Sequence, residues 1–244
     1  MGMGMTDFAA ATDRSTPGFE RLTFGEWVVR AASGSTGRAN SATPHGDPGT
    51  SVAEGIDRME RWYAERGAPP KVMVWDTTAS EVVDELARRG YAGGAPTDVM
   101  AAPLDRVWSR LAAKGRPHTR LEPEPPELLR SLISEDRLAE IIHTDLERRF
   151  AVAFDDEGDI GTGMVVFDPP LVGLFAMRTR DDRQGEGAGS AVVRALLAGA
   201  AERGCGTAWL QVEADNHRAN EWYARLGFVN RARYTYWDRA DSRP

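Results

Sequence analysis

The apolar positions of residues 149–228 change between the spacing of strands and the spacing of helices. Short apolar runs typical of strands occupy 149–154, 161–167, 171–177 and 208–213. A glycine-containing acidic turn joins the first two runs, which predicts a hairpin. One helical face between the last two runs is marked by Val192, Val193, Leu196, Leu197 and Ala200. A second helix follows 208–213, so the pattern predicts an α/β unit.

A similar order of strands and helices is predicted for residues 26–90. Strands are expected at 26–30 and 71–75, which are rich in valine and tryptophan. A helix that ends at Gly67 is marked by Val52, Ile56, Met59 and Tyr63. A second helix, which ends at Gly90, follows a pattern that resembles a capping box, Thr78-x-x-Glu81.

The two parts of the chain share short matches at one offset of 137 residues. Glu65-Arg-Gly67 recurs as Glu202-Arg-Gly204, and Gly90-Tyr91 recurs as Gly227-Phe228. The same offset superimposes the strand at 72–75 on the strand at 209–212. These matches predict a duplicated unit. Two unrelated α/β units with coincident spacing are the alternative.

The composition along the chain predicts four segments. Residues 1–18 are small and polar, and are expected to be disordered. Residues 19–104 form the first unit and 127–244 the second. The proline-rich stretch 105–126 is expected to link them, and a short helix is expected at its beginning, at 104–113. Apolar positions between 128 and 146 predict one long or two short helices at the start of the second unit.

Asp182–Ser190 is a glycine-rich turn between a buried strand and a helix. This order points free backbone N–H groups and the positive end of the helix at one place, which suits a phosphate. A P-loop is excluded because its lysine is missing. A dinucleotide fingerprint is excluded because the third glycine is replaced, by Ser190 in one register and by Val192 in the other.

Two motifs in this part resemble those of the GCN5-related N-acetyltransferases. Gln184, Gly187 and Gly189 are similar to the family's acyl-CoA pyrophosphate loop, Gln/Arg-x-x-Gly-x-Gly/Ala. The last strand–helix signature of the family is matched by Asn216, Ala219, Tyr223, Gly227 and Phe228. The resemblance covers about residues 145–238. It implies an α/β fold of two tandem acyl-CoA N-acyltransferase-like units, with mixed twisted sheets flanked by helices.

The resemblance also implies a reaction and its participants. Acetyl-CoA is expected as co-substrate, without a metal, and its acetyl group is expected to pass directly to the amine of a small molecule in a ternary complex. A non-catalytic acyl-CoA sensor is one alternative, and an enzyme that acetylates a protein N-terminus or lysine is another. An acidic groove over the thioester would favour a protein acceptor, and a closed pocket formed with the first unit would oppose it.

Site residues follow from the same resemblance. Tyr223 is expected to protonate the leaving thiolate. Glu213 is the first candidate for the base that deprotonates the amine, with His143 or a residue of the first unit as alternatives. A backbone N–H near Met177 could stabilise the oxyanion, and Arg183 could contact a phosphate. The residues expected to bind the cofactor are Met177, Thr179, Gln184, Gly185, Glu186, Gly187, Gly189, Ser190 and Asn216.

The first unit is predicted to be a degenerate copy. The offset places Gln184, Gly187 and Gly189 on Asp47, Thr50 and Val52, so the phosphate loop is lost there. The segment around Trp27 and the following Gly/Ser-rich stretch resemble the first half of actinobacterial tandem acetyltransferases. Structural pins between the halves and a remote acceptor pocket are both open roles for Arg30, Arg38 and Asn40.

Charge and cysteine content limit the kinds of partner and of cellular compartment that we expect. A net charge of −7 and a pI of about 5.2 argue against nucleic acid or an anionic membrane as main partner. The single cysteine, Cys205, suits a reducing cytoplasm. Zinc-like spacing and a Gly-x-Ser-x-Gly elbow are missing from the sequence. A homodimer is compatible with the sequence.

Overall fold

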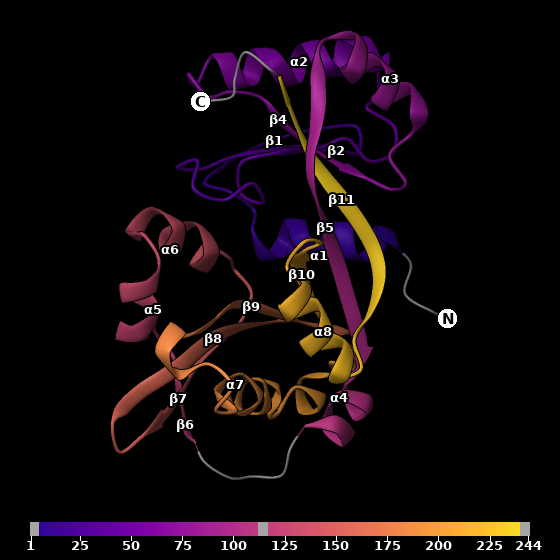
Figure 1. Ribbon diagram of the computed structural model, residues 1–244. Coiled ribbons are helices and arrows are strands. Elements are labelled where there is room, and N and C mark those ends of the chain that lie inside the picture. The colour runs from indigo at the N-terminus through magenta and orange to yellow at the C-terminus, as the bar shows by residue number, and fades with distance from the viewer. Residues whose placement is uncertain (1–4, 112–116, 240–244) are drawn as a thin grey trace.

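The computed structural model describes residues 5–111 and 117–239. Figure 1 shows two lobes joined by long strands. The first part of the chain contains α1 (Met5–Ser15), β1 (Glu20–Phe24), β2 (Trp27–Ala31), β3 (Ala42–Thr43), α2 (Val52–Ala64), β4 (Lys71–Trp75), α3 (Ser80–Arg88), β5 (Tyr91–Pro103) and α4 (Leu104–Arg110). Among the described residues, no helix is long and apolar enough to cross a membrane.

The second part of the chain forms the lower lobe of Figure 1. Its elements are β6 (His118–Glu122), α5 (Glu127–Leu132), α6 (Glu135–Ile142), β7 (Arg148–Asp155), β8 (Gly158–Asp168), β9 (Leu171–Thr179), η1 (Asp181–Arg183), α7 (Ala188–Leu197), η2 (Ala201–Arg203), β10 (Thr207–Glu213), α8 (His217–Arg225) and β11 (Val229–Arg239). Two short helices, α5 and α6, therefore cover 127–142.

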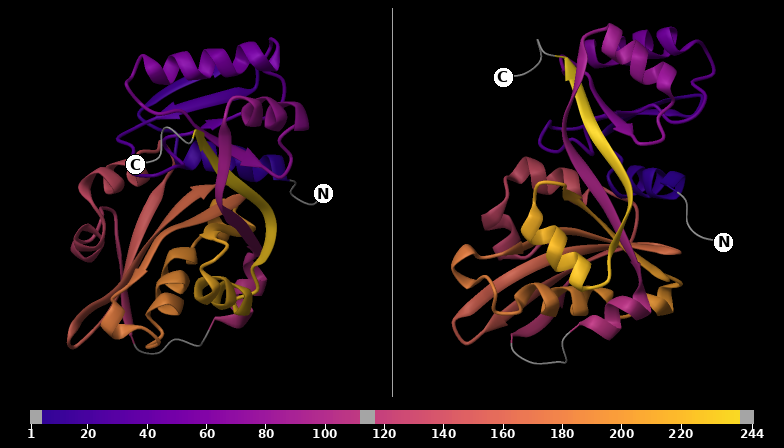
Figure 2. Two further views of the ribbon diagram at one scale, coloured as in Figure 1. Left: turned by 45° about the horizontal axis from the view of Figure 1, so that its top comes forward. Right: turned by 45° about the vertical axis from the view of Figure 1, so that its right-hand side comes forward.

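One mixed sheet runs through both lobes in the order β1-β2-β3-β4-β11-β5-β10-β9-β8-β7-β6. The two lobes exchange their last strands: β11 pairs with β4 of the upper lobe, and β5 pairs with β10 of the lower lobe. Figure 2 shows β5 and β11 side by side between the lobes. The predicted fold is confirmed, and the sheets of its two units are continuous through these strands.

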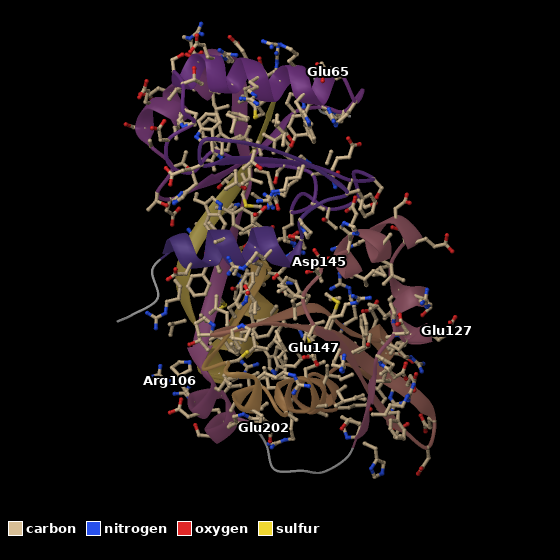
Figure 3. All side chains as sticks on the ribbon, turned by 180° about the vertical axis from the view of Figure 1, so that it is seen from behind. Glu65, Arg106, Glu127, Asp145, Glu147 and Glu202 are labelled. Carbon is tan, nitrogen blue, oxygen red and sulfur yellow. The ribbon has the colours of Figure 1, made fainter. Side chains whose placement is uncertain are left out.

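Equivalent elements of the two lobes lie at the offset seen in the sequence. Ser80–Arg88 and His217–Arg225, which form α3 and α8, are separated by 137 residues at both ends. Glu65 and Glu202, from the repeated tripeptide, lie at opposite ends of the molecule in Figure 3. The order of strands and helices thus agrees with a duplicated unit.

Three predictions about segments are wrong. Residues 5–15 form α1, although 1–18 were predicted to be disordered; Phe8 and Ala11 are buried, and Phe8 lies 6.1 Å from Trp209 between ring centroids. Part of the predicted linker is the edge strand β6, paired with β7. The capping box is not at Thr78, whose hydroxyl accepts from the backbone N–H of Trp75. A capping box is present at the start of α2 instead, where it is formed by Ser51 and Glu54.

A loop of the upper lobe, residues 33–40, is fastened to α6 of the lower lobe by the buried carboxylate of Glu140. Ser33 Oγ donates to Glu140 at 2.7 Å, the backbone N–H groups of residues 35 and 36 at 2.9 and 2.5 Å, and Asn40 Nδ2 at 2.8 Å. Arg30 is also fully buried and pairs with Asp13 of α1 at 3.2 Å. Asn40 therefore helps to join the two lobes, as one of its two predicted roles requires, whereas Arg30 joins α1 to the strands of the upper lobe.

We expect Glu140→Ala to lower the free energy of unfolding by about 3 kcal/mol, because it leaves several buried donors without an acceptor. Burial alone would raise the pKa of the Glu140 carboxyl, but the hydrogen bonds from Ser33, Asn40 and the backbone outweigh it and lower that pKa. The stabilisation is therefore complete above the unfolded pKa of about 4.3 and is lost as pH falls through the lower folded pKa.

Urea unfolding of the wild type, Glu140→Ala and Glu140→Gln at pH 7 and at about pH 3.5 measures this effect. Glu140→Gln keeps one acceptor oxygen and is expected to lose less stability than Glu140→Ala at pH 7. The difference between the wild type and Glu140→Ala is expected to shrink at the lower pH. Equal stability of all three proteins at pH 7 would show that the loop is not held by this carboxylate.

Candidate active site

The glycine turn before α7 has the backbone geometry expected of a phosphate cradle. Gly185 and Gly187 have φ angles of +91° and +86°, which side chains other than glycine rarely adopt. Gly187 is the N-terminal cap residue of α7, so the first free N–H groups of that helix lie next to it. Among the described residues, the atom nearest to a Cβ built at Gly187 is Pro117 Cδ at 4.0 Å. Within the described part of the chain, the turn is therefore open on this side.

Gly189 has a different requirement, because α7 and α8 meet there. A Cβ at Gly189 would lie 3.0 Å from Cζ2 of Trp222, which is tighter than ordinary contact. Glycine thus lets the start of α7 approach the indole of α8. The two glycines that the sequence singled out serve separate purposes: Gly187 the backbone turn, and Gly189 the helix packing.

Strands β9 and β10 diverge beside this turn. Their parallel pairing runs only from Leu171–Thr207 to Leu174–Leu210, although both strands continue beyond it. Ala176 has a φ of +50°, and the pairing of β9 with β8 shifts register there. The bulge changes the direction of the backbone, so that Met177, which follows it, faces the gap between β9 and β10.

A cleft with a volume of about 630 Å³ lies between this gap, the glycine turn and α8. That volume is within the range of small-molecule sites. The predicted site residues that line it are Met177, Thr179, Gln184, Gly185, Gly187, Gly189, Ser190, Asn216 and Tyr223. The lining found among the described residues does not include Glu186 or Glu213.

The polar side chains at the glycine turn divide into those turned to the cleft and those held elsewhere. Arg183 forms ion pairs with Asp155 at 2.5 Å and with Glu186 at 2.7 Å, so neither Arg183 nor Glu186 offers its side chain to a phosphate. Gln184 accepts a hydrogen bond from Arg218 of α8. Arg218 lines the cleft and brings the positive charge that we had expected from Arg183.

Tyr223 lies on α8 with its ring between Trp222 and Phe228, at centroid distances of 4.6 and 5.7 Å. The side chain is buried, yet it lines the cleft. Burial raises the pKa of the Tyr223 hydroxyl well above its ordinary value, and the nearby Arg178 guanidinium opposes that change only in part. The hydroxyl therefore remains protonated at neutral pH, as a proton donor must.

The turn from β10 to α8 carries the other predicted polar residues. Asn216 Oδ1 accepts from Ala219 N at 3.1 Å and caps α8, while Asn220 Nδ2 donates to the carbonyl oxygen of Glu213 at 3.0 Å. The Glu213 side chain is exposed at the end of β10. His143 stacks edge-on against Phe19 at 5.0 Å, at the contact between lobes.

Several residues of the cleft were not predicted. They are Arg178, Asp181, Ala188, Arg218, Trp222 and Arg225. Arg218 and Trp222 stand at unspecified positions inside the Asn216–Phe228 signature, and helical spacing puts Arg218 and Trp222 on one face. That spacing is the signal that could have identified them. Arg178 gives no such signal, because a bulge determines its direction.

Other reactive groups do not form a second centre in the described part of the chain. Cys205 is buried, its Sγ lies 3.1 Å from the carbonyl oxygen of Leu171, and burial raises the pKa of its thiol. Such a thiol is unreactive, and its side chain only fills space in the core. No group of three histidine, cysteine or acidic side chains in residues 5–111 and 117–239 could hold a metal ion.

Comparison with known proteins agrees with this geometry. The family model described as "Probable histone acetyltransferase Rv0428c C-terminal" matches residues 5–237. The "Uncharacterized N-acetyltransferase YobR" of Bacillus subtilis is 25% identical over 226 residues, which cover 88% of this chain and 90% of that protein.

Solved structures share the fold. A GCN5-related N-acetyltransferase from Kribbella flavida superimposes with a TM-score of 0.73 at 14% identity, over 98% of this chain and 97% of that one. A tandem GNAT protein from the clavulanic acid biosynthesis pathway gives a TM-score of 0.59 at 13% identity, over 76% and 67% of the two chains. The tandem architecture of two linked units thus has a solved relative in fold.

Proposed function

The chain belongs to the acetyltransferase family whose model spans residues 5–237, and it has the fold of a GCN5-related N-acetyltransferase. From this premise we propose that it transfers the acetyl group of acetyl-CoA to the amine of a small molecule. The observation that carries the proposal is one continuous cleft. A phosphate-binding turn at Gly187 lies at one end, and the protonated hydroxyl of Tyr223 lies beside the gap between β9 and β10.

Residues of the cleft, together with Glu213 at the end of β10, supply each step of a direct transfer. The neutral amine nitrogen attacks the thioester carbonyl carbon, and the backbone N–H at Met177 stabilises the oxyanion. The C–S bond then breaks, and the leaving thiolate takes its proton from Tyr223. Glu213, at the end of β10, accepts the amine proton through water. Because amine and thioester meet in one ternary complex, an acetylated enzyme is not formed.

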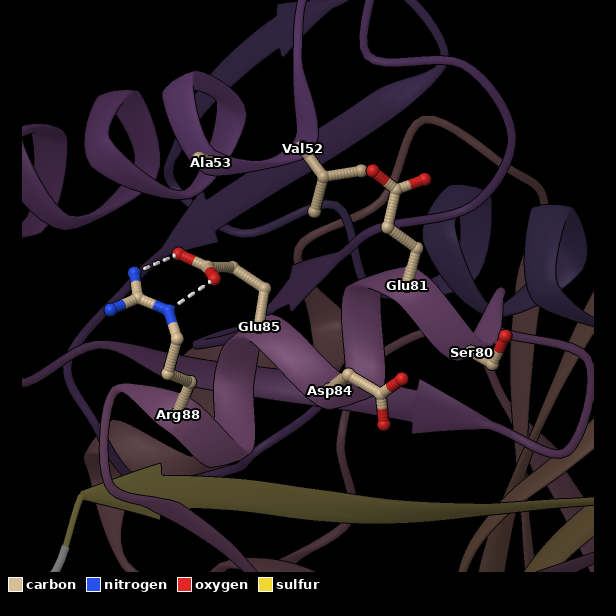
Figure 4. A pocket seen from close by; sticks show the side chains of 7 residues that line it. All are labelled: Val52, Ala53, Ser80, Glu81, Asp84, Glu85 and Arg88. Carbon is tan, nitrogen blue, oxygen red and sulfur yellow. Dashed lines mark hydrogen bonds and ion pairs between the residues drawn. The ribbon is translucent and has the colours of Figure 1, made fainter.

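We further propose that the upper lobe carries no working acyl-CoA site. Its cleft between α2 and α3 corresponds to the cleft between α7 and α8, but it is lined by Glu81, Asp84 and Glu85 (Figure 4). Arg88 is paired with Glu85 at 2.6 Å. Carboxylates at this place repel phosphates, which supports the interpretation of the upper lobe as a degenerate copy.

Thiol release from acetyl-CoA, followed with a panel of amines, tests the proposed activity. We expect at least one small amine to increase thiol release above the rate of hydrolysis, with stoichiometric N-acetylation by mass spectrometry. Acetyl-CoA binding without release for any amine would favour a sensor. Acetylation of peptides but not of small amines would favour a protein acceptor, and either result would reject the proposal.

A further inference from the structure

Three arginines from three different elements lie near the gap between β9 and β10, and one of them, Arg178, lines the cleft. Arg38, in the 33–40 loop of the upper lobe, donates from Nη1 to Gln211 Oε1 on β10 at 2.8 Å. Gln211 lies one residue beyond the last β9–β10 pair, in the diverging part of β10. Its own Nε2 donates to Thr12 Oγ1 of α1 at 2.7 Å. The upper lobe thus places a guanidinium group at the gap between β9 and β10.

Arg137 reaches the same region from α6. It is half-buried and lies three residues before Glu140, so both side chains share one face of the helix. Glu140 holds the 33–40 loop through four hydrogen bonds, as described above. The contact that fastens the loop therefore also brings Arg137 close to Arg38.

Arg178 completes the cluster from β9. It directly follows Met177, donates from Nη1 to the Met177 carbonyl oxygen at 2.9 Å and lines the cleft. Its side chain is exposed, yet its partial shielding from water at the cleft, and then the positive charges of Arg137 and Arg38, lower the pKa of its guanidinium. Tyr223 and Glu213 act in the opposite direction. Arg178 therefore lies within electrostatic reach of both other arginines and of the proposed catalytic groups.

The arginines of the cluster have no ion-pair partner within residues 5–111 and 117–239. Arg30, Arg89 and Arg183 each form ion pairs with carboxylates. In contrast, none of the three clustered arginines forms an ion pair with any residue in the described part of the chain. The nearby carboxylate of Glu140 is occupied by its four donors. Three uncompensated guanidinium groups in a chain of net charge −7 indicate a ligand with negative charge.

We propose that the acceptor is a small amine that also carries an oxyanion, a carboxylate or a phosphate, and that Arg38, Arg137 and Arg178 bind this group. The inference rests on the proposed acetyl transfer. Guanidinium groups bind such oxyanions through charge-assisted hydrogen bonds. A lysine-rich tail would place its positive charges against the cluster and is disfavoured.

Two matched pairs of amines test the proposal: phosphoethanolamine against ethanolamine, and β-alanine against propylamine. We expect the wild type to favour at least one anionic member about 10- to 100-fold in kcat/KM. Arg38→Gln and Arg137→Gln are expected to raise the KM of that amine and to remove most of the preference, with acetyl-CoA affinity unchanged by calorimetry. The control is Arg61→Gln, which removes an exposed positive charge on α2 and is expected to keep the preference.

A binding measurement separates this inference from the activity itself. Inorganic phosphate and acetate are titrated into the protein saturated with CoA, whose phosphates already occupy the glycine turn. Binding that weakens in Arg38→Gln and Arg137→Gln, but not in Arg61→Gln, supports the anion site even if none of the amines releases thiol. Failure of both anions to bind, or equal or better use of the neutral amines or of a lysine-rich peptide, would overturn the inference while leaving acetyl transfer intact.

Discussion

Replacing Tyr223 with phenylalanine is expected to lower turnover about 100- to 10,000-fold, the usual range for a lost general acid. The ring packs between Trp222 and Phe228, and phenylalanine keeps that packing. Acetyl-CoA affinity and thermal stability should therefore stay close to wild type. Because burial raises the pKa of the hydroxyl, the wild-type enzyme should not lose this proton as pH rises to about 10, the ordinary pKa of tyrosine.

Tyr91→Phe is a matched control, because it removes a partly buried hydroxyl far from the cleft. Tyr91 donates to Glu60 in the upper lobe at 3.0 Å. Its loss is expected to affect stability slightly and turnover not at all. Steady-state thiol release and a single-turnover measurement are compared for the two variants and the wild type. Unchanged turnover in Tyr223→Phe would remove Tyr223 from the mechanism.

The parts of the fold and site that the sequence predicted well are local in the chain. The glycine turn, α7, β10 and α8 follow one another within about fifty residues, and each carries its own periodicity or cap. The glycine turn at Gly187 could therefore be located from the sequence, between the strand and the helix that flank it. Nine of the predicted cofactor and catalytic residues line one cleft for the same reason.

The parts that escaped prediction depend on distant contacts. The strand β5 begins with Tyr-Ala-Gly-Gly-Ala-Pro, a composition typical of a loop. This part is a strand because β11 pairs with it, and β10 pairs only with the later residues of β5. The helix α1 looks polar in sequence, and Phe8 is buried because it packs in a cluster of residues distant in the chain, Trp209 among them. The cluster of Arg38, Arg137 and Arg178 joins positions up to 140 residues apart. Periodicity carries no information on such pairings.

We expect Gly187→Val to abolish measurable acetyl-CoA binding while leaving the fold intact. Gly187 has a φ of +86°, where a β-branched residue is strained. The turn must then change, and the N–H groups that begin α7 lose their common direction towards the pyrophosphate. Gly189→Val should have the same outcome by another route, because its Cβ would press on Trp222. Calorimetric titration with acetyl-CoA measures both.

Gly90→Val separates backbone strain from the loss of the cradle. Gly90 has a φ of +84°, almost the same as Gly187, and a Cβ there meets no described atom within 4 Å. It ends α3 in the upper lobe, away from the cleft. Both variants should therefore lose a similar amount of stability in urea unfolding, and Gly90→Val alone should bind acetyl-CoA as the wild type does. Unaltered affinity in Gly187→Val would refute the assignment of Asp182–Ser190 as the pyrophosphate loop, whereas equal loss in both variants would trace the effect to stability.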